Sequence, residues 1–426
     1  MNPRAMKSIL FSLYALYTLQ CGLAPLRADL LLQPNDLVAV TGDSITEQRR
    51  YSVLIEDYLL MCQPATGLNA LQLGSGGAGA YVGGMRAPFN LAPFHPQVAT
   101  MLYGMNDGQY QPLNEPMAAG FRRGTTDSIE AYKKLGVRTI LVSSPTCICV
   151  KGQTADQVMY NHTLGAFGDM AKKIAADEGV AFTDTHGIMA AVIAKGVAAD
   201  PNYNLGPDGV HQEWAGHLVM AYAMLKGLGC DGAIGTITVD LKTGEATGTP
   251  GQKIVTAQKE VLSPGTVQVE STRYPFCFTG DAKDPQSTLN VINYLPFNQD
   301  LNRYMLVVKN LTGSKAKVTW GNTSKEFTAD QLAKGVNLAA AFAGDNPFSA
   351  AFAKVNDAVV AQQTDETGLT KYWLGGMKDL VSSLPSQGPL LDQITQVGIK
   401  ERNRLAQAAA AAVVPVDHTI KVEPEP

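Results

Sequence analysis

The chain has 426 residues, of which 45% are apolar and 17% are charged. This is an ordinary globular composition, which allows two or three domains and excludes disorder over most of the chain. The formal net charge is −4 and no basic stretch is interleaved with aromatic residues, so we expect no nucleic-acid partner.

Residues 1–28 have the layout of a secretory signal peptide. Arg4 and Lys7 precede the apolar run 9–19, and small residues then lead to Ala28, after which we expect cleavage. The run is too short to span a bilayer comfortably, and no later stretch is long and apolar enough to do so. We therefore expect a secreted or periplasmic protein with no stable membrane insertion after cleavage. An uncleaved amino-terminal anchor is the alternative.

Five cysteines remain after that cleavage, and an odd number cannot all pair within the chain. They are Cys62, Cys147, Cys149, Cys230 and Cys277. Export would permit one disulfide, while partly buried free thiols are an equally good interpretation. Cys147 and Cys149 have no matching histidine or cysteine pair, so they are a weak metal signal.

Short apolar strands alternate with amphipathic helices up to residue 228. The predicted strands are Leu37–Thr41, Ala70–Leu73, Val98–Tyr103, Arg138–Ser143 and Val180–Thr183. The predicted helices are Tyr51–Leu60, Met117–Leu135, Asp156–Glu178 and Glu213–Leu228. This alternation predicts an α/β three-layer sandwich, in which helices cover both faces of a central parallel sheet.

After about residue 233 the composition changes to threonine, valine and glycine. Alternating segments predict strands at Thr236–Leu241, Thr266–Glu270, Met305–Val308 and Ala316–Trp320. Helical periodicity returns from Pro347, and His418–Val422 is either an edge strand or a frayed tail. We therefore divide the chain into a signal peptide (1–28), an α/β domain (29–235), a β-rich accessory region (236–345) and a helical carboxyl-terminal segment (346–426).

Residues capable of chemistry follow the predicted strands. Ser44 ends the turn Gly42-Asp43-Ser44 after the first strand, a glycine-rich loop (74–79) follows the second, and Gly104-Met105-Asn106-Asp107 follows the third. Asp208-Gly209-Val210-His211 precedes the last helix of this part. In open α/β sheets ligands bind beyond the carboxyl ends of the strands. A serine there can act as a nucleophile if a base and an anion-stabilising pocket lie beside it.

Each of these motifs is weak when it is taken alone. Glycine, aspartate and serine are all common in turns, and the glycine loop lacks the spacing of phosphate-binding loops. A lone Asp-x-x-His is more often a capped loop with a satisfied histidine.

The order of the four motifs, however, resembles that of the SGNH, or GDSL-type, serine hydrolase family over residues 37–228. The resemblance implies a flavodoxin-like sheet in an SGNH hydrolase domain. It implies Ser44 as the nucleophile, His211 as the general base and Asp208 as the residue that orients His211. It also implies an oxyanion hole formed by the backbone N–H groups of Ser44 and Gly77 and the amide of Asn106, with Gly76 as the alternative to Gly77. No metal and no organic cofactor are implied.

Several neighbouring residues receive structural interpretations. We expect Asp43 and Asp107 to order their loops by accepting hydrogen bonds, and His217 to be an ordinary helix residue. Gln212 stands where the family often has proline, which departs from its pattern without removing a catalytic group. Trp214 either packs against the domain or lines the pocket.

The later part of the chain resembles, less specifically, the β-rich extension of exported GDSL-type proteins of planctomycete-like and related bacteria. The resemblance rests on Asp300–Tyr304 and Thr328–Leu338. Such proteins are regarded as candidate carbohydrate esterases. The extension would either bind glycan or cover the edge of the sheet.

We therefore expect an exported serine esterase that removes short acyl groups, above all acetyl, from a carbohydrate. Its partner would be a small-molecule or polysaccharide ester. The alternative activities are a lipid or aryl esterase and a sugar acyltransferase. The alternative outside enzymes is an inactive glycan-binding or surface protein.

Overall fold

The computed structural model describes residues 30–149, 152–255, 265–374 and 388–425, together with Gly376, Ser383 and Ser386. The expected signal peptide at residues 1–28 lies outside these described residues. Within them, no helix combines the length and the apolar character needed to cross a membrane.

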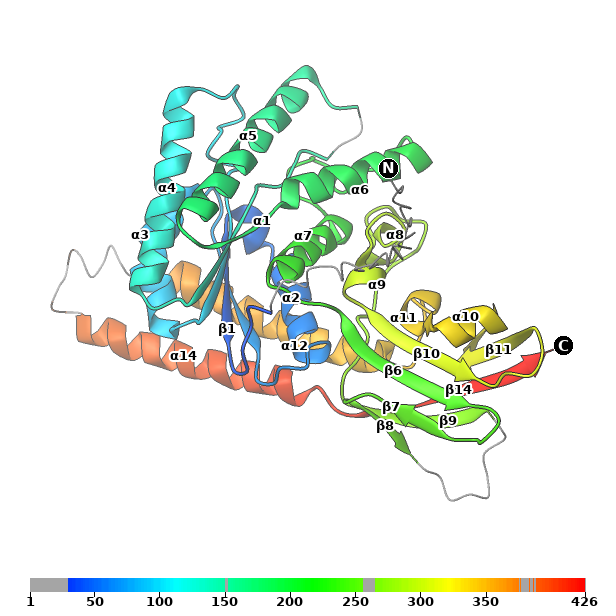
Figure 1. Ribbon diagram of the computed structural model, residues 1–426. Coiled ribbons are helices and arrows are strands. Elements are labelled where there is room, and N and C mark those ends of the chain that lie inside the picture. The colour runs from blue at the N-terminus through cyan, green and yellow to red at the C-terminus, as the bar shows by residue number, and fades with distance from the viewer. Residues whose placement is uncertain are drawn as a thin grey trace, which may run out of the picture.

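The first part of the chain is built on a five-stranded parallel sheet with strand order β2-β1-β3-β4-β5 (Figure 1). Its strands are β1 (Leu37–Gly42), β2 (Asn69–Gly74), β3 (Val98–Leu102), β4 (Thr139–Ser143) and β5 (Ala181–Thr183). This is the flavodoxin-like order, in which the chain reverses direction across the sheet between β1 and β3. Gly42 pairs with Gly74 on one side and Leu102 on the other. The loops that follow β1, β2 and β3 therefore leave the sheet at the same level.

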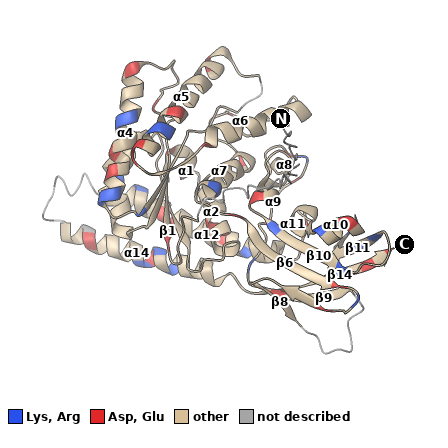
Figure 2. Cartoon of the chain, viewed as in Figure 1, with Lys and Arg blue, Asp and Glu red and all other residues tan. Residues whose placement is uncertain are grey.

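Helices cover both faces of this sheet (Figure 1). Val38 and Val40 point to the face covered by α2 and α7, whereas Ala39 points to the face covered by α4 and α5. The helices are α1 (Ser44–Glu47), α2 (Arg50–Met61), α3 (Ala80–Arg86), α4 (Glu115–Lys134), α5 (Ala155–Asp177), α6 (Thr185–Ala199) and α7 (Trp214–Gly227), with a π-helix η1 (Ala87–Leu91) and a 3₁₀-helix η2 (Ala92–Phe94). Figure 2 shows that both signs of charge occur along α4.

The predicted α/β fold class is confirmed, and each predicted strand and helix of this part is present within a few residues. The prediction missed α3 and α6. Apolar residues occur all round α6, so no amphipathic period marks it. Helix α3 contains Gly83 and Gly84, which favour loops in a sequence-based assignment.

Two further sheets face each other after residue 232. One is mixed, with strand order β13-β10-β6-β7, and the other is antiparallel, with strand order β12-β11-β14-β9-β8. The strands are β6 (Ala233–Asp240), β7 (Ala246–Gly248), β8 (Gln252–Val255), β9 (Thr266–Ser271), β10 (Arg303–Lys309), β11 (Lys315–Trp320), β12 (Thr323–Thr328), β13 (Val336–Asn337) and β14 (Val416–Glu425). Short helices join them: α8 (Thr288–Val291), α9 (Phe297–Asp300), α10 (Ala329–Lys334) and α11 (Leu338–Ala341). The four strands predicted for this region are confirmed, whereas the domain boundaries at 235 and 345 stay predictions.

The carboxyl-terminal segment returns to the first sheet and then leaves it again. Helix α12 (Ser349–Thr367), the π-helix η3 (Gly368–Leu374) and helix α14 (Gly388–Ala411) lie along its β2 edge, and β14 then joins the antiparallel sheet (Figure 1). Strand β14 pairs with both β11 and β9. The expectation of an edge strand or a frayed tail is therefore wrong, because this strand lies inside the sheet.

Candidate active site

Ser44 lies at the first residue of α1, directly beyond the carboxyl end of β1. Asp43 caps this short helix, since its Oδ1 accepts the N–H of Ile45 at 2.9 Å. The turn is tight: a Cβ on Gly42 would lie 2.0 Å from Thr46 Oγ1 and 2.7 Å from the carbonyl oxygen of Leu102. Only glycine therefore fits at the end of the strand, and Ser44 is left half-buried with its hydroxyl available.

The structure brings Ser44, His211 and Asp208 into one hydrogen-bonded chain. Ser44 Oγ lies 2.9 Å from His211 Nε2, and His211 Nδ1 lies 2.9 Å from Asp208 Oδ2. Asp208 Oδ1 also accepts the backbone N–H groups of His211 at 2.7 Å and Val210 at 2.9 Å. Partial burial acts to raise the pKa of Asp208, but these hydrogen bonds outweigh it and lower the pKa below its usual value. The carboxylate therefore stays ionised beside the imidazole.

The loop that carries His211 is tied to α2. Arg50 donates to the carbonyl oxygen of Gln212 at 2.9 Å and forms an ion pair with Glu213 at 2.6 Å. Its guanidinium also lies 5.7 Å from the ring centre of Trp214, whose side chain is 37% exposed. The guanidinium of Arg50 therefore lies over the ring of Trp214, and the rest of this side chain is partly exposed to solvent.

His217 is a buried structural residue, as expected. Its Nδ1 accepts the N–H of Tyr51 at 3.2 Å, and its Nε2 lies 2.9 Å from Gln48 Oε1. Burial and the nearby Arg50 lower the pKa of His217 well below its usual value, so the ring is neutral and donates to Gln48. It joins α7 to the start of α2 and takes no part in the Ser44 contact.

The glycine loop presents a backbone N–H group with no acceptor. The loop is a four-residue turn closed by the N–H of Ala78 donating to the carbonyl oxygen of Ser75 at 3.1 Å, with Gly77 at φ +73°. Glu47 Oε2 accepts the N–H of Gly76 at 2.5 Å. The N–H groups of Gly77 and Ser44 make no hydrogen bond to any other described residue. Of the two glycines considered, only Gly77 thus keeps a free donor.

Asn106 and Asp107 join the loop after β3 to the glycine loop. Asn106 Nδ2 donates to the carbonyl oxygen of Ala78 at 3.1 Å and lies 3.4 Å from Asp43 Oδ2. Asp107 accepts the N–H of Ala80 at 2.9 Å and so caps α3. The expected loop-ordering roles of Asp43 and Asp107 are confirmed.

Burial raises the pKa of Asp43 to about 7, although the N–H of Ile45 acts to lower it. Burial likewise raises the pKa of Asp107 to about 6 against the N–H of Ala80. Both carboxyl groups are therefore largely removed from water, and it is costly for both to be ionised at once.

A pocket of about 740 Å³ opens beside these donors. Gly77 and Asn106 form part of its wall, and the lining is both polar (Tyr81, Gln109, Asn114, Arg123) and apolar (Pro116, Met117, Phe121). Tyr81 is 58% exposed. Among the described residues, no group of three or more His, Cys, Asp or Glu side chains is placed to hold a metal ion. The described cysteines, including Cys147 and Cys149, are buried free thiols.

Two residues of the site were not predicted from sequence. Glu47 holds Gly76, and Lys371 from η3 forms an ion pair with Glu47. Glu47 lies three residues after Ser44 and could have been suspected from that position alone. Nothing in the sequence marks Lys371, because surface lysines are common and its partner is 324 residues away.

A second Ser–His contact lies in the β-rich part. Ser271 Oγ is 2.9 Å from His418 Nε2, but Ser271 is 0% and His418 6% exposed. Trp320 Nε1 donates to His418 Nδ1 at 3.1 Å. A neutral His418 must therefore carry its proton on Nε2 and donate it to Ser271 or Tyr304, so it cannot act as a base toward either.

Comparison with known proteins gives a family match for part of the chain and a similar fold for most of it. The model of the GDSL-like lipase/acylhydrolase family matches residues 40–219. The solved structure of the gut microbial diltiazem-metabolizing enzyme BT4096 is similar in fold, with a TM-score of 0.71 and 21% identity, over 92% of this chain and 98% of that one. The acetylxylan esterase Axe2 from Geobacillus stearothermophilus aligns at a TM-score of 0.40 and 22% identity, over 47% of this chain and 97% of its own. No match was found among the curated protein sequences.

Proposed function

Because residues 40–219 form a domain of the GDSL-like lipase/acylhydrolase family and the chain is an ester hydrolase, we propose that Ser44 is its nucleophile. His211 is the general base and Asp208 orients it. The observation that carries this assignment is the unbroken chain of two 2.9 Å contacts from Ser44 through His211 to Asp208. A serine hydroxyl needs a base at neutral pH, and an imidazole needs a carboxylate to fix its tautomer.

In the first step Ser44 Oγ attacks the carbonyl carbon of the ester and His211 Nε2 takes the hydroxyl proton. His211 Nδ1–H donates to Asp208, which leaves the Nε2 lone pair facing Ser44. As the tetrahedral intermediate collapses, His211 returns the proton to the leaving alcohol. Water, deprotonated by His211 in turn, then hydrolyses the acyl-serine and regenerates the hydroxyl of Ser44.

The negative charge of the tetrahedral intermediate is stabilised by three donors: the backbone N–H groups of Ser44 and Gly77 and the side-chain amide of Asn106. The first two have no acceptor among the described residues. One Asn106 N–H is engaged by Ala78, while the other makes only a long 3.4 Å contact with Asp43 and can turn to the substrate. Donors fixed before the reaction are worth several kcal/mol to such a state.

The substrate we propose is a short acyl ester, above all an acetyl ester, of a carbohydrate. The pocket beside the donors combines amide, guanidinium and tyrosine side chains with the apolar Met117 and Phe121, and its polar groups can bind the hydroxyl groups of a carbohydrate. We also propose that the protein is secreted or periplasmic, on the layout of residues 1–28.

The test of the nucleophile is hydrolysis of a nitrophenyl acetate by the purified protein and by two serine variants. We expect Ser44→Ala to abolish turnover and labelling by a fluorophosphonate. Ser271→Ala, the matched control from the buried Ser–His contact, should keep both. Equal rates in the wild type and Ser44→Ala would overturn the assignment. A folded protein with neither turnover nor labelling would favour an inactive binding protein.

The substrate class is tested separately. Acetate release from a panel of acetylated polysaccharides, compared with nitrophenyl esters from acetyl to palmitoyl, separates a carbohydrate esterase from a lipid or aryl esterase. Faster turnover with an added sugar that becomes acylated would instead indicate an acyltransferase.

A further inference from the structure

The side chain of Glu47 connects the nucleophile helix to the glycine loop and to the carboxyl-terminal segment. Glu47 lies on the same short helix as Ser44. Its Oε2 accepts the N–H of Gly76 at 2.5 Å, and its Oε1 forms an ion pair with the ammonium of Lys371. Glu47 is 20% and Lys371 35% exposed in this pair. Lys371 belongs to η3, outside the residues that match the family model.

A second set of contacts fixes the same part of the chain. Arg49 donates to Thr367 Oγ1 at 3.3 Å, just before η3 begins. Gln72, whose Oε1 lies 3.2 Å from Thr367 Oγ1, donates to the carbonyl oxygen of Thr46 at 2.8 Å. The end of α12 and the start of η3 therefore hold in place the short helix α1, which begins at Ser44.

The hydrogen bond to Gly76 matters because of the turn in which it lies. The positive φ of Gly77 at the third position of a closed four-residue turn is the type II arrangement. In such turns the peptide between the second and third residues, here Gly76 and Gly77, is the one that reverses when the turn changes type. The N–H of that peptide is the Gly77 donor. A carboxylate that holds Gly76 in place restricts the direction in which Gly77 points.

We propose that Glu47 and Lys371 are positioning residues of the oxyanion hole. Lys371 holds the carboxylate of Glu47 against the N–H of Gly76, and this sets the neighbouring N–H of Gly77 before substrate arrives. The carboxyl-terminal segment, which carries Lys371, then helps to set the geometry of the active site. This inference rests on the proposed function, in which Gly77 stabilises the oxyanion.

The kinetic test compares Lys371→Met, Glu47→Ala and the conservative Lys371→Arg in nitrophenyl acetate hydrolysis. Poorly set donors raise the barrier of the chemical step, so we expect the first two to lose kcat on the order of ten- to a hundredfold with little change in KM. Lys371→Arg keeps the ion pair and should keep most of kcat. Lys134→Met, which breaks an exposed ion pair with Glu130 on α4, is the matched control and should behave as wild type.

A charge exchange separates positioning from a merely structural ion pair. In the double variant Glu47→Lys with Lys371→Glu the pair is restored, but a lysine at position 47 cannot accept the N–H of Gly76. We expect the midpoint of thermal unfolding to return to the wild-type value, while kcat stays as low as in Lys371→Met and Glu47→Ala. Recovery of kcat in this variant would overturn the proposal.

Hydrogen exchange tests the geometry without any turnover. We expect faster amide exchange in the glycine loop (75–79) of Lys371→Met and Glu47→Ala than in the wild type. In Lys134→Met the loop should exchange at the wild-type rate. Unchanged exchange would overturn the proposal, and so would faster exchange with an unchanged kcat. Absence of Ser44-dependent turnover in the wild type would instead overturn the proposed function, and the exchange data would still decide whether Lys371 holds the loop.

Discussion

At the scale of single residues, the two Ser–His contacts of this protein show why distance alone does not define a nucleophile. Both have Oγ–Nε2 distances of 2.9 Å. In one, Asp208 accepts from His211 Nδ1 and leaves the Nε2 lone pair facing Ser44, as the proposed mechanism requires. In the other, Trp320 donates to Nδ1 and burial lowers the pKa of His418 to about 4, so this imidazole remains neutral with its proton on Nε2. The residue that is bonded to Nδ1 therefore decides whether Nε2 can accept a proton from the serine.

A further prediction at this scale concerns Asn106. Replacing it with alanine removes one of the proposed oxyanion donors, and we expect kcat in nitrophenyl acetate hydrolysis to fall roughly a hundredfold or more with KM nearly unchanged. Asn403 is an exposed asparagine of α14 that does not line this pocket. Asn403→Ala serves as the control. An Asn106→Ala protein as fast as this control would contradict the role of the amide.

The sequence was informative about residues whose partners are close in the chain or whose order is characteristic. Asp208 and His211 are three positions apart, so their contact follows from a local turn. Ser44, Gly77 and Asn106 follow successive strands of a predictable sheet. The spacing of the glycines does not distinguish Gly76 from Gly77, because the difference between them is that Glu47 accepts the N–H of Gly76.

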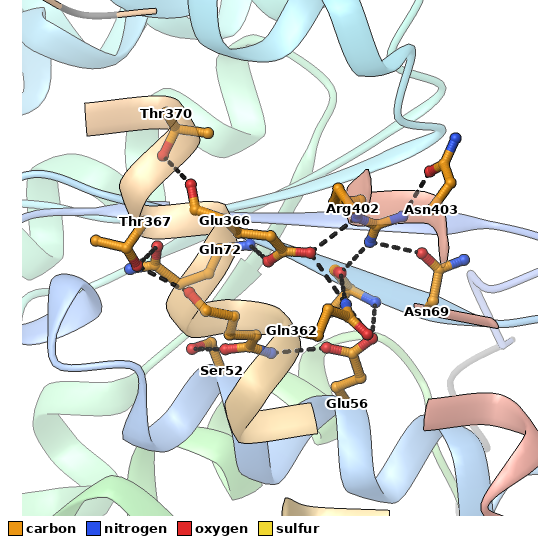
Figure 3. A network of polar contacts seen from close by, with 12 residues as sticks. Ser52, Glu56, Asn69, Gln72, Gln362, Glu366, Thr367, Thr370, Arg402 and Asn403 are labelled. Carbon is orange, nitrogen blue, oxygen red and sulfur yellow. Dashed lines mark hydrogen bonds and ion pairs between the residues drawn. The ribbon is translucent and has the colours of Figure 1, made fainter. Parts of the chain in front are cut away.

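At the scale of elements, β2 is an edge strand, and its unpaired side is covered by side chains rather than by another strand. Arg402 of α14 donates to the carbonyl oxygen of Ala70 at 2.5 Å. Glu366 of α12 accepts the N–H of Gln72 at 2.9 Å (Figure 3). Glu56 of α2 accepts the N–H of Ala70 at 3.1 Å. These bonds satisfy backbone groups that an uncovered edge would offer to another chain. The sequence left open whether the β-rich extension binds glycan or covers an edge of the sheet; at the β2 edge the covering side chains come from α2, α12 and α14.

The network contains two buried carboxyl groups and one guanidinium. Arg402 and Glu366 form an ion pair at 2.8 Å, with side chains that are 4% and 0% exposed. Burial first, and the nearby Glu366 second, raise the pKa of Glu56 to about 7, while Arg402 acts to lower it. Gln362 donates to both carboxylates, at 2.9 Å to Glu56 and 3.0 Å to Glu366 (Figure 3). Removing the cation would leave an uncompensated buried charge.

We therefore expect Arg402→Met to lower the free energy of unfolding by about 3–5 kcal/mol near neutral pH. Glu366 would then be a buried carboxylate without its cation, and it would regain stability by binding a proton. The loss should accordingly be smaller at pH 5 than at pH 8. Urea unfolding at the two pH values measures both effects.

The matched control is Arg404→Met, two residues further along α14. Arg404 forms an exposed ion pair with Glu401, and because water screens such pairs, its removal should leave the free energy of unfolding nearly unchanged. Equal losses in the two variants would contradict a special role for the buried pair.

At the scale of the whole molecule, the chain passes three times between its α/β part and its β-rich part: after α7, before α12 and after α14. Helices α12 and α14 lie along the β2 edge, and β14 then returns to the antiparallel sheet between β9 and β11 (Figure 1). The α/β part was predictable because its strands are short apolar runs joined by periodic helices. The place of β14 was not, because its partners lie roughly 100 to 150 residues earlier and alternation cannot identify them.

The side chains of β14 complete the core of the β-rich part. Besides accepting from Trp320, His418 lies 2.9 Å from the hydroxyl of Tyr304 in the opposite sheet. Ile420 and Val422 are both 0% exposed. A chain that ends at residue 415 should therefore leave β9 and β11 without their shared neighbour, while α12 and α14 still cover β2.

For this truncated chain we expect faster hydrogen exchange in residues 266–271 and 315–320, with β1 and β3 still protected. Trp320 is the buried tryptophan of the described residues, so its emission should shift to longer wavelength as its site opens. A chain lacking only residues 425 and 426 keeps most of the pairing and is the control. A synthetic peptide of residues 412–426 should restore protection when it is added to the truncated chain. Unchanged exchange in β9 and β11 would mean that the sheet does not depend on its last strand. A collapse of protection throughout β1 and β3 would mean instead that the two parts unfold as one unit, because α12 and α14 transmit the loss from one sheet to the other.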